Sequence, residues 1–213
     1  MNHLQSALNR DVATLLRHTV YSNWSVSIEG ESNVPCDGPA IIAPLHTTLH
    51  DGYLLLAYSP RPLSVVKRYD QQSNLALHLF EQLRMIAACA VGSVIIDRSD
   101  TSASNRNMAF LTGSRVPNLR QFSTRAQNVL RDGQLLCVFP QGERRPRGEI
   151  GQLARGVGTL ALITNTPIIP TDIHCSDHAA TITYGEPIMP TGNSRTLTAL
   201  LREYFADLID QRP

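Results

Sequence analysis

The sequence predicts an α/β protein of one domain, in which a central mixed, largely parallel sheet is flanked by helices and preceded by an N-terminal amphipathic helix. Short apolar runs alternate with segments of helical periodicity, as they do when helices connect parallel strands. The 213 residues fit a single domain, and 42% hydrophobic residues are enough to build a core. We expect the amphipathic helix within residues 1–23 and the folded domain over 24–213.

The first expected element is a helix over residues 3–20. Arg10 and Arg17 lie off its apolar face, which is formed by Leu4, Leu8, Val12, Leu15, Leu16 and Thr19. Such a helix packs on the domain core or lies on a membrane surface, and the sequence leaves both interpretations open.

Alternating and apolar runs predict the elements of the first half of the domain. In order, these are a strand at 24–29, a strand at 39–44, a helix at 51–58, a strand at 63–66, a helix at 74–84 and a strand at 93–96. The first strand alternates with a period of two, and the second is an apolar run between two prolines. Residues 99–119 are polar and predict a surface insertion that could cover or reshape a pocket.

The second half of the domain continues the alternation. Its expected elements are a helix at 119–131, a strand at 134–139, a helix at 152–164, strands at 167–174 and 180–184, and a closing helix at 197–209. Asp132 and Gly133 form a typical helix stop. A loop rich in Arg, Gly and Pro occupies 140–151. Functional loops of such sheets follow the carboxyl ends of the strands.

Composition excludes several classes of protein. Nineteen basic against 18 acidic residues give a net charge of +1, which argues against a nucleic-acid binder. We find neither an apolar run long enough to cross a bilayer nor a secretory signal, and we expect a cytoplasmic protein. The four cysteines are scattered and indicate free thiols, not a disulfide or zinc framework.

A histidine and an aspartate follow the strand at 39–44. His46 precedes Asp51 by five positions at a strand-to-helix junction, where the carboxylate can orient the imidazole as a general base for a hydroxyl. The pattern alone is weak, because a surface histidine beside a helix N-terminus would look the same. Metal binding by His46, His50 and Asp51 is a second alternative, although no further ligand cluster completes such a site.

Arginines follow two other strands. Arg98 comes after the strand at 93–96, and three arginines within 144–147 follow Gly142 in the loop after 134–139. Guanidinium groups there suit a phosphate or carboxylate, although a solvated ion pair and an exposed basic loop are the alternatives. The chain lacks a Gly-x-Ser-x-Gly nucleophile, a Walker loop and a dinucleotide fingerprint. The pattern favours an enzyme whose nucleophile is the hydroxyl of its substrate.

Five sequence blocks in order resemble the lysophospholipid acyltransferase family, which includes the 1-acylglycerol-3-phosphate acyltransferases. The His46 block resembles the family's His-x4-Asp motif, and Lys67 matches a basic residue that the family often carries. The later blocks are GSVIIDR at 92–98, FPQGER at 139–144, LARG at 153–156 with TPIIP at 166–170, and YGEPI at 184–188. The similarity covers residues 24–210, so it identifies 24–213 as an acyltransferase domain.

The resemblance implies a mechanism. His46, oriented by Asp51, would deprotonate a hydroxyl that attacks the thioester of acyl-CoA or acyl-carrier protein. Lys67 and backbone amides would stabilise the oxyanion. Arg98 and Arg144 would bind the acceptor's phosphate with help from Arg155. The acceptor pocket would include Gln141, Gly142 and Glu143. No metal and no cofactor beyond the thioester co-substrate is implied.

Two departures from the family pattern concern the acceptor. Gln141 stands where the family usually has Glu, and Glu143 where it usually has Thr. A lysophosphatidate-like acceptor is the first expectation, and another lyso-lipid or a hydroxyl or amine of a specialised pathway is the second. A thioester hydrolase and an inactive lipid-binding module are further alternatives. We expect activity to fall as acid protonates His46, and we expect peripheral contact with a membrane through residues 3–20 or delivery of the acyl group by a soluble carrier.

Overall fold

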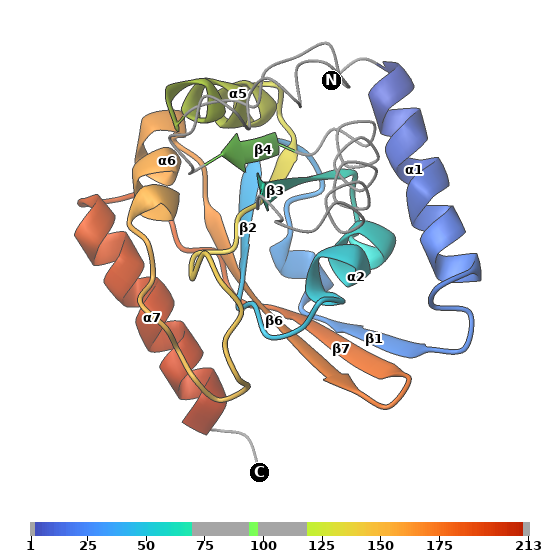
Figure 1. The fold of residues 1–213 in the computed structure, drawn as a ribbon. Coiled ribbons are helices and arrows are strands. Elements are labelled where there is room, and N and C mark those ends of the chain that lie inside the picture. Colours follow the sequence, from blue (N-terminus) through green and yellow to red (C-terminus); the bar gives the residue numbers. More distant parts are fainter. Residues whose placement is uncertain (1–2, 70–93, 98–118, 211–213) are drawn as a thin grey trace.

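The computed structural model describes residues 3–69, 94–97 and 119–210, with side chains placed at 7–66 and 123–210. The predicted helix at 74–84 and nearly all of the predicted insertion at 99–119 lie outside these residues. Figure 1 shows a twisted sheet at the centre of the described part, with helices on both of its faces.

Within the described residues, one sheet contains seven strands in the order β1-β7-β6-β2-β5-β3-β4. Their bounds are β1 Ser25–Glu29, β2 Ala40–Pro44, β3 Leu63–Tyr69, β4 Val94–Asp97, β5 Leu135–Cys137, β6 Ile168–Ser176 and β7 Ala179–Tyr184. All neighbouring pairs are parallel except β6 with β7. The prediction of a mixed, largely parallel sheet is therefore confirmed.

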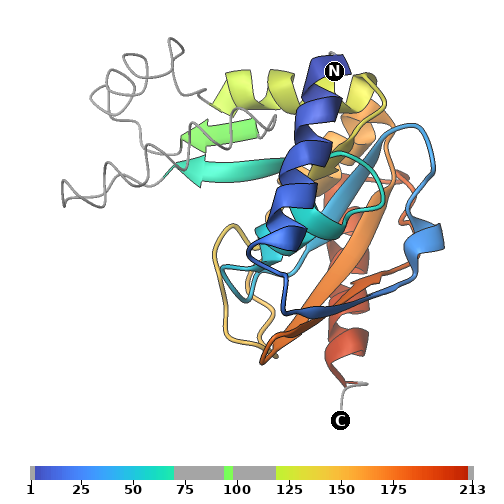
Figure 2. The ribbon, with the colours of Figure 1, turned by 90° about the vertical axis from the view of Figure 1, so that its right-hand side faces the viewer.

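The helices divide into two layers. On one face, α1 (His3–His18) packs against α2 (Asp51–Tyr58), and on the other lie α5 (Leu119–Arg131), α6 (Gly156–Thr164) and α7 (Ser194–Asp210). Figure 2, turned by 90°, shows α1 in front of the sheet and α7 behind it.

Strand β2 lies at the centre and contributes to two cores. Ile42 faces a cluster that includes Leu54 and Leu55 of α2, whereas Ile41 and Ala43 face a cluster with helices α5, α6 and α7. All five residues of β2 are buried, as expected for a strand covered on both faces. The loop that follows β2 is therefore held by the most rigid part of the domain.

Some element bounds differ from those predicted. The helices expected at 51–58 and 119–131 have those bounds. Strand β3 continues to Tyr69, which places Lys67 inside the strand. Helix α6 begins at Gly156 instead of 152, because the preceding chain is held by the hydrogen bond from Ala154 N to Pro140 O. Helix α7 begins at Ser194 instead of 197, where the Asn193 side chain caps it.

Helix α1 divides its apolar side chains between the core and solvent. Ala13 is buried and Leu16 packs on the core, whereas Leu8 and Leu15 are exposed. The buried side chains suit a helix packed on the domain core, and the exposed ones suit a helix on a membrane surface. No helix in the described part of the chain is long and apolar enough to span a bilayer.

Candidate active site

His46 and Asp51 meet at the junction between β2 and α2. His46 lies in the loop after β2, and Asp51 is the first residue of α2. The His46 Nδ1 atom is 2.8 Å from Asp51 Oδ2. The Asp51 side chain is fully buried, while 24% of the His46 side chain is exposed. The pair thus joins a buried carboxylate to an imidazole that reaches the surface.

The Asp51 carboxylate is held by donors from the preceding loop. Its Oδ2 accepts the backbone N–H groups of Thr47 (2.7 Å) and Thr48 (2.9 Å), and its Oδ1 accepts the Thr48 hydroxyl (2.6 Å). The carboxylate also lies at the N-terminus of α2, where the helix dipole interacts favourably with a negative charge. These bonds compensate for the burial of the ion and fix its orientation.

This geometry determines which nitrogen of the His46 imidazole can accept a proton. When Nδ1–H donates to Asp51, Nε2 carries the lone pair that can accept a proton. The Phe139 ring lies against the His46 ring, with centroids 4.2 Å apart and planes inclined by 33°. The imidazole is thus contacted at Nδ1 by the Asp51 carboxylate and on its ring by Phe139.

The loop after β5 holds the backbone of His46 on both sides. The Gln141 Oε1 atom accepts the His46 N–H at 2.8 Å, and the Arg145 N–H donates to the His46 carbonyl at 2.9 Å. The Gln141 amide nitrogen also donates to the Glu149 carbonyl, at 3.4 Å. Gly142, at φ 71°, turns the chain between Gln141 and Arg145 in the left-handed region that favours glycine.

The remaining side chains of this loop are exposed. Glu143 forms an ion pair with Arg145, so its carboxylate has a partner within the loop. Arg144 is exposed beside them. Gln141 and Glu143, the two departures from the family pattern, therefore both make contacts within the protein.

The other residues predicted from the sequence lie at three places. Lys67 is on β3, paired in register with Ile95 of β4, and only its backbone is described. Arg98 lies outside the described residues, directly after β4. Arg155 precedes α6 and lines a pocket with α7, and none of that pocket's residues is among the contacts described for His46.

Three groups that contact His46 or Asp51 were not predicted from the sequence. They are Thr48, the Phe139 ring and the Arg145 backbone N–H. Thr48 has a signal in the sequence, because Thr-x-x-Asp before an apolar run resembles a capping box. The other two depend on how the loops after β2 and β5 meet in space, and no local pattern records this.

His50 takes no part in the pair. Its Nδ1 atom lies 3.3 Å from the Tyr21 hydroxyl, and its ring is 5.1 Å from that of Trp24. Burial raises the pKa of the Tyr21 hydroxyl, which stays protonated. Among the described residues there is no group of three or more His, Cys, Asp or Glu side chains that could hold a metal ion.

Cys175 lies next to the pair. Burial, followed by the nearby Asp51 carboxylate, raises the pKa of the Cys175 thiol, and a hydrogen bond with Thr48 opposes this shift. A raised pKa leaves little thiolate at neutral pH, so Cys175 is a poor nucleophile. That the nucleophile is a hydroxyl of the substrate stays a prediction from the sequence patterns.

This constellation defines a domain in which a carboxylate-oriented histidine lies at the carboxyl end of a parallel sheet. The Acyltransferase family model matches residues 25–174, and the chain belongs to that family. The resemblance drawn from the sequence blocks is therefore confirmed.

Individual proteins with similar sequences add detail to this family assignment. It is 26% identical over 180 residues to a chloroplastic 1-acyl-sn-glycerol-3-phosphate acyltransferase of Arabidopsis thaliana, covering 84% of this chain and 42% of that protein. It is 24% identical over 143 residues to a 1-acyl-sn-glycerol-3-phosphate acyltransferase of Pseudomonas aeruginosa, covering 67% and 47%. The chain thus spans less than half the length of these curated relatives.

The fold has a solved counterpart. The structure of the 1-acyl-sn-glycerophosphate acyltransferase of Thermotoga maritima superimposes with a TM-score of 0.69 at 16% identity. The superposition covers 97% of this chain and 80% of that one. At this identity, the likeness shows that the two chains share a fold.

Proposed function

We propose that the protein transfers an acyl group from a CoA or acyl-carrier-protein thioester to a hydroxyl of a lysophosphatidate-like acceptor. The observation that carries this proposal is the 2.8 Å contact between His46 Nδ1 and the buried Asp51 carboxylate. It leaves Nε2 as the acceptor of a proton in a chain whose motifs provide no nucleophile. The relatives act, by their names, on 1-acyl-sn-glycerol 3-phosphate.

The reaction has two proton transfers at one nitrogen. The Nε2 atom of His46 takes the proton of the acceptor hydroxyl while the oxygen attacks the thioester carbonyl carbon. The resulting imidazolium is stabilised by Asp51. The carbon–sulfur bond then breaks, and the thiolate takes the proton back from Nε2. The products are the acylated acceptor and a free thiol.

Other residues have supporting roles in this proposal. Lys67, at the same end of the sheet, stabilises the oxyanion with backbone amides. Arg98 and the exposed Arg144 bind the phosphate of the acceptor, because guanidinium groups pair well with phosphate oxygens. Gly142 allows the acceptor to approach the backbone of the loop closely.

Membrane contact is part of the proposal, because the acceptor is a lipid. Exposed apolar side chains occur on α1, in the turn that follows it, and close to the His46–Asp51 pair in sequence; they are Leu8, Leu15, Val20, Leu49 and Tyr53. An apolar surface next to the reacting group suits a protein that lies on a bilayer and takes its substrate from there.

A different acceptor is the second candidate function. The Gln141 amide and the Glu143 carboxylate both have partners within the protein. With these contacts in place, the groups that the family pattern would offer to a glycerol phosphate are occupied. Acyl transfer to another lyso-lipid, or to a hydroxyl or amine that carries no phosphate, uses the same His46 chemistry.

The test measures thiol release and the acylated product together. We expect the purified chain, given acyl-CoA and lysophosphatidate, to release one thiol for each acyl group transferred. The variant His46→Ala should lower the rate by about a thousandfold or more, whereas His18→Ala on an exposed part of α1 should not change it. The rate should also fall toward acid pH, because a protonated Nε2 cannot act as a base.

Each alternative gives a different result. Thiol release that does not depend on any acceptor would indicate a thioester hydrolase. Acylation of other alcohols or amines, but never of lysophosphatidate, would favour the second candidate. Full activity of His46→Ala, or a flat rate between about pH 5 and 8, would contradict the role of His46 in either case.

A further inference from the structure

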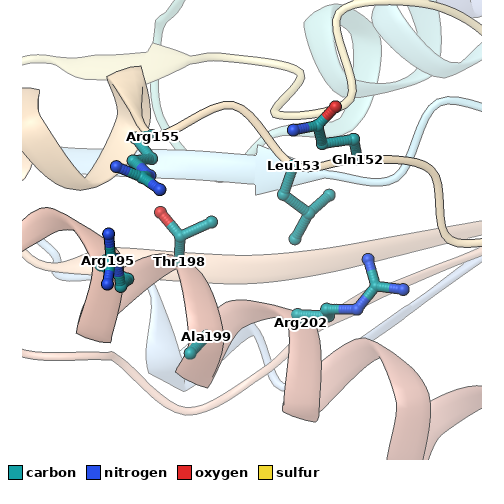
Figure 3. A pocket seen from close by; sticks show the side chains of 7 residues that line it. All are labelled: Gln152, Leu153, Arg155, Arg195, Thr198, Ala199 and Arg202. Atoms are coloured by element: carbon teal, nitrogen blue, oxygen red, sulfur yellow. The ribbon is translucent and has the colours of Figure 1, made fainter.

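A pocket of about 260 Å³ lies between the start of α6 and the first turns of α7. It is lined by Gln152, Leu153, Arg155, Arg195, Thr198, Ala199 and Arg202. Figure 3 shows Arg155 across from Arg195 and Thr198, and Arg202 farther along α7. Three arginines from two separate segments of the chain therefore line one hollow, with Arg155 and Arg195 at one end of it and Arg202 at the other.

The charges in this pocket are unbalanced. None of the seven lining residues is acidic, whereas three carry a guanidinium group. Arg202 uses one nitrogen, Nη1, to donate to the Gly151 carbonyl at 3.0 Å, and its other N–H groups remain. The Thr198 hydroxyl donates to the Ser194 carbonyl. The pocket thus offers N–H donors and positive charge, a set that favours an anion with several oxygens.

The pocket borders the loop that holds His46. Arg202 bonds to the carbonyl of Gly151, and a Cβ atom at Gly151 would lie 3.3 Å from Arg145 Nε and 3.7 Å from Gln141 Nε2. Gln141 and Arg145 in turn bond to the backbone of His46. A chain of contacts through this loop therefore connects Arg202 of the pocket with the backbone of His46.

We infer that this pocket binds a phosphate monoester, at a site separate from the His46–Asp51 pair. Its volume suits a phosphate with a small substituent better than a whole lipid. It lies beside α7, across the sheet from α1, the helix that the proposed function places against a membrane, while α6 and α7 expose Ile163 and Leu200 on the pocket's own side. A soluble phosphate is the source that this position favours. If the proposed function holds, coenzyme A supplies one, because its ribose carries a phosphate monoester.

The test measures binding instead of activity. The full chain is titrated by calorimetry with orthophosphate at constant ionic strength, because salt screens exposed charges. We expect Arg195→Gln to weaken binding about tenfold, the size expected for one lost charge-assisted contact, and the double variant with Arg202→Gln to weaken it further. The control is Arg125→Gln, which removes an exposed arginine of α5 and should bind like the parent.

Two further probes distinguish the sources of the phosphate. Tighter binding of coenzyme A than of dephospho-coenzyme A, with the difference lost in Arg195→Gln, assigns the site to a soluble monoester. Retention on vesicles that contain phosphatidate, lost in the same variant, assigns it to a lipid headgroup. Both results support a phosphate site. Arg195→Lys keeps the charge and should retain part of the binding, which separates charge from folding.

The inference is overturned if the parent binds none of these probes, or if the double variant binds all of them as tightly as the parent. The variant His46→Ala should bind orthophosphate normally. Failure of the parent to transfer an acyl group would disprove the proposed function and leave the pocket unaffected. Unchanged binding in the arginine variants would disprove the pocket and leave the proposed function unaffected.

Discussion

The loops after β2 and after β5 meet at His46, but they are built in opposite ways. In the first, a buried carboxylate accepts two backbone N–H groups and a hydroxyl, all from residues three or four positions away in sequence. In the second, residues 143–149 are all exposed, and the buried Gln141 reaches across 95 positions to His46. The comparison teaches that the His46–Asp51 contact is fixed by residues close in sequence, whereas the loop after β5 joins one buried side chain, Gln141, to a run of exposed residues.

The largest loss of activity should come from Asp51→Asn, which removes the carboxylate that accepts the hydrogen bonds of the loop after β2. The amide keeps one oxygen that can accept the backbone N–H groups of Thr47 and Thr48, but it carries no charge and could not stabilise a charged imidazole. We expect a loss in rate of about a thousandfold to ten-thousandfold with CoA release as the readout. Asp11→Asn on the exposed side of α1 is the matched control. A loss below about tenfold would show that Asp51 does not orient His46.

Thr48→Val should have the next largest effect. It removes the hydroxyl that donates to Asp51 at 2.6 Å, while the backbone N–H of residue 48 remains. We expect the free energy of unfolding to fall by about 1–3 kcal/mol and the rate to fall with it. Thr48→Ser keeps the hydroxyl and should restore both quantities in denaturant titration and kinetic assays. If the serine variant behaves like the valine variant, packing and not the hydrogen bond is responsible.

The variant Gln141→Glu tests the loop after β5. The new carboxylate can still accept the His46 N–H, but it cannot donate to the Glu149 carbonyl. We expect a loss of about 1 kcal/mol in the free energy of unfolding and a change in the KM of the acceptor larger than the change in kcat. A kcat that falls as far as in Asp51→Asn would mean that Gln141 belongs with the reacting pair.

The smallest effect concerns the thiols. Burial raises the pKa of the Cys175 thiol, so little of it is in the reactive thiolate form near neutral pH. Cys36, in contrast, is exposed to solvent. At pH 8 we expect iodoacetamide to modify Cys36 well before Cys175, as followed by peptide mass spectrometry. Thr48→Val should change the rate at Cys175 and leave Cys36 unaffected. Equal rates at the two cysteines in the parent would contradict the shielding of the region around Asp51.

The sequence predicted best what depends on short-range patterns. The bounds of α2 match the prediction for the short apolar segment 51–58, and the His46–Asp51 contact follows from a strand that ends just before a helix begins. It could not predict that Gln141 and Arg145 bond to the His46 backbone, because that contact depends on the parallel register of β2 and β5. Nor could it place Arg155 beside α7, since helix packing brings together positions 40 or more residues apart in sequence.

Because both backbone groups of His46 are bonded to the loop after β5, that residue belongs structurally to two motifs at once. Consider a chimera that takes the His-x4-Asp segment from a relative and keeps residues 140–149 of this chain. Its two loops would not be matched to form the hydrogen bonds that join them here. Exchanging both segments together should preserve turnover.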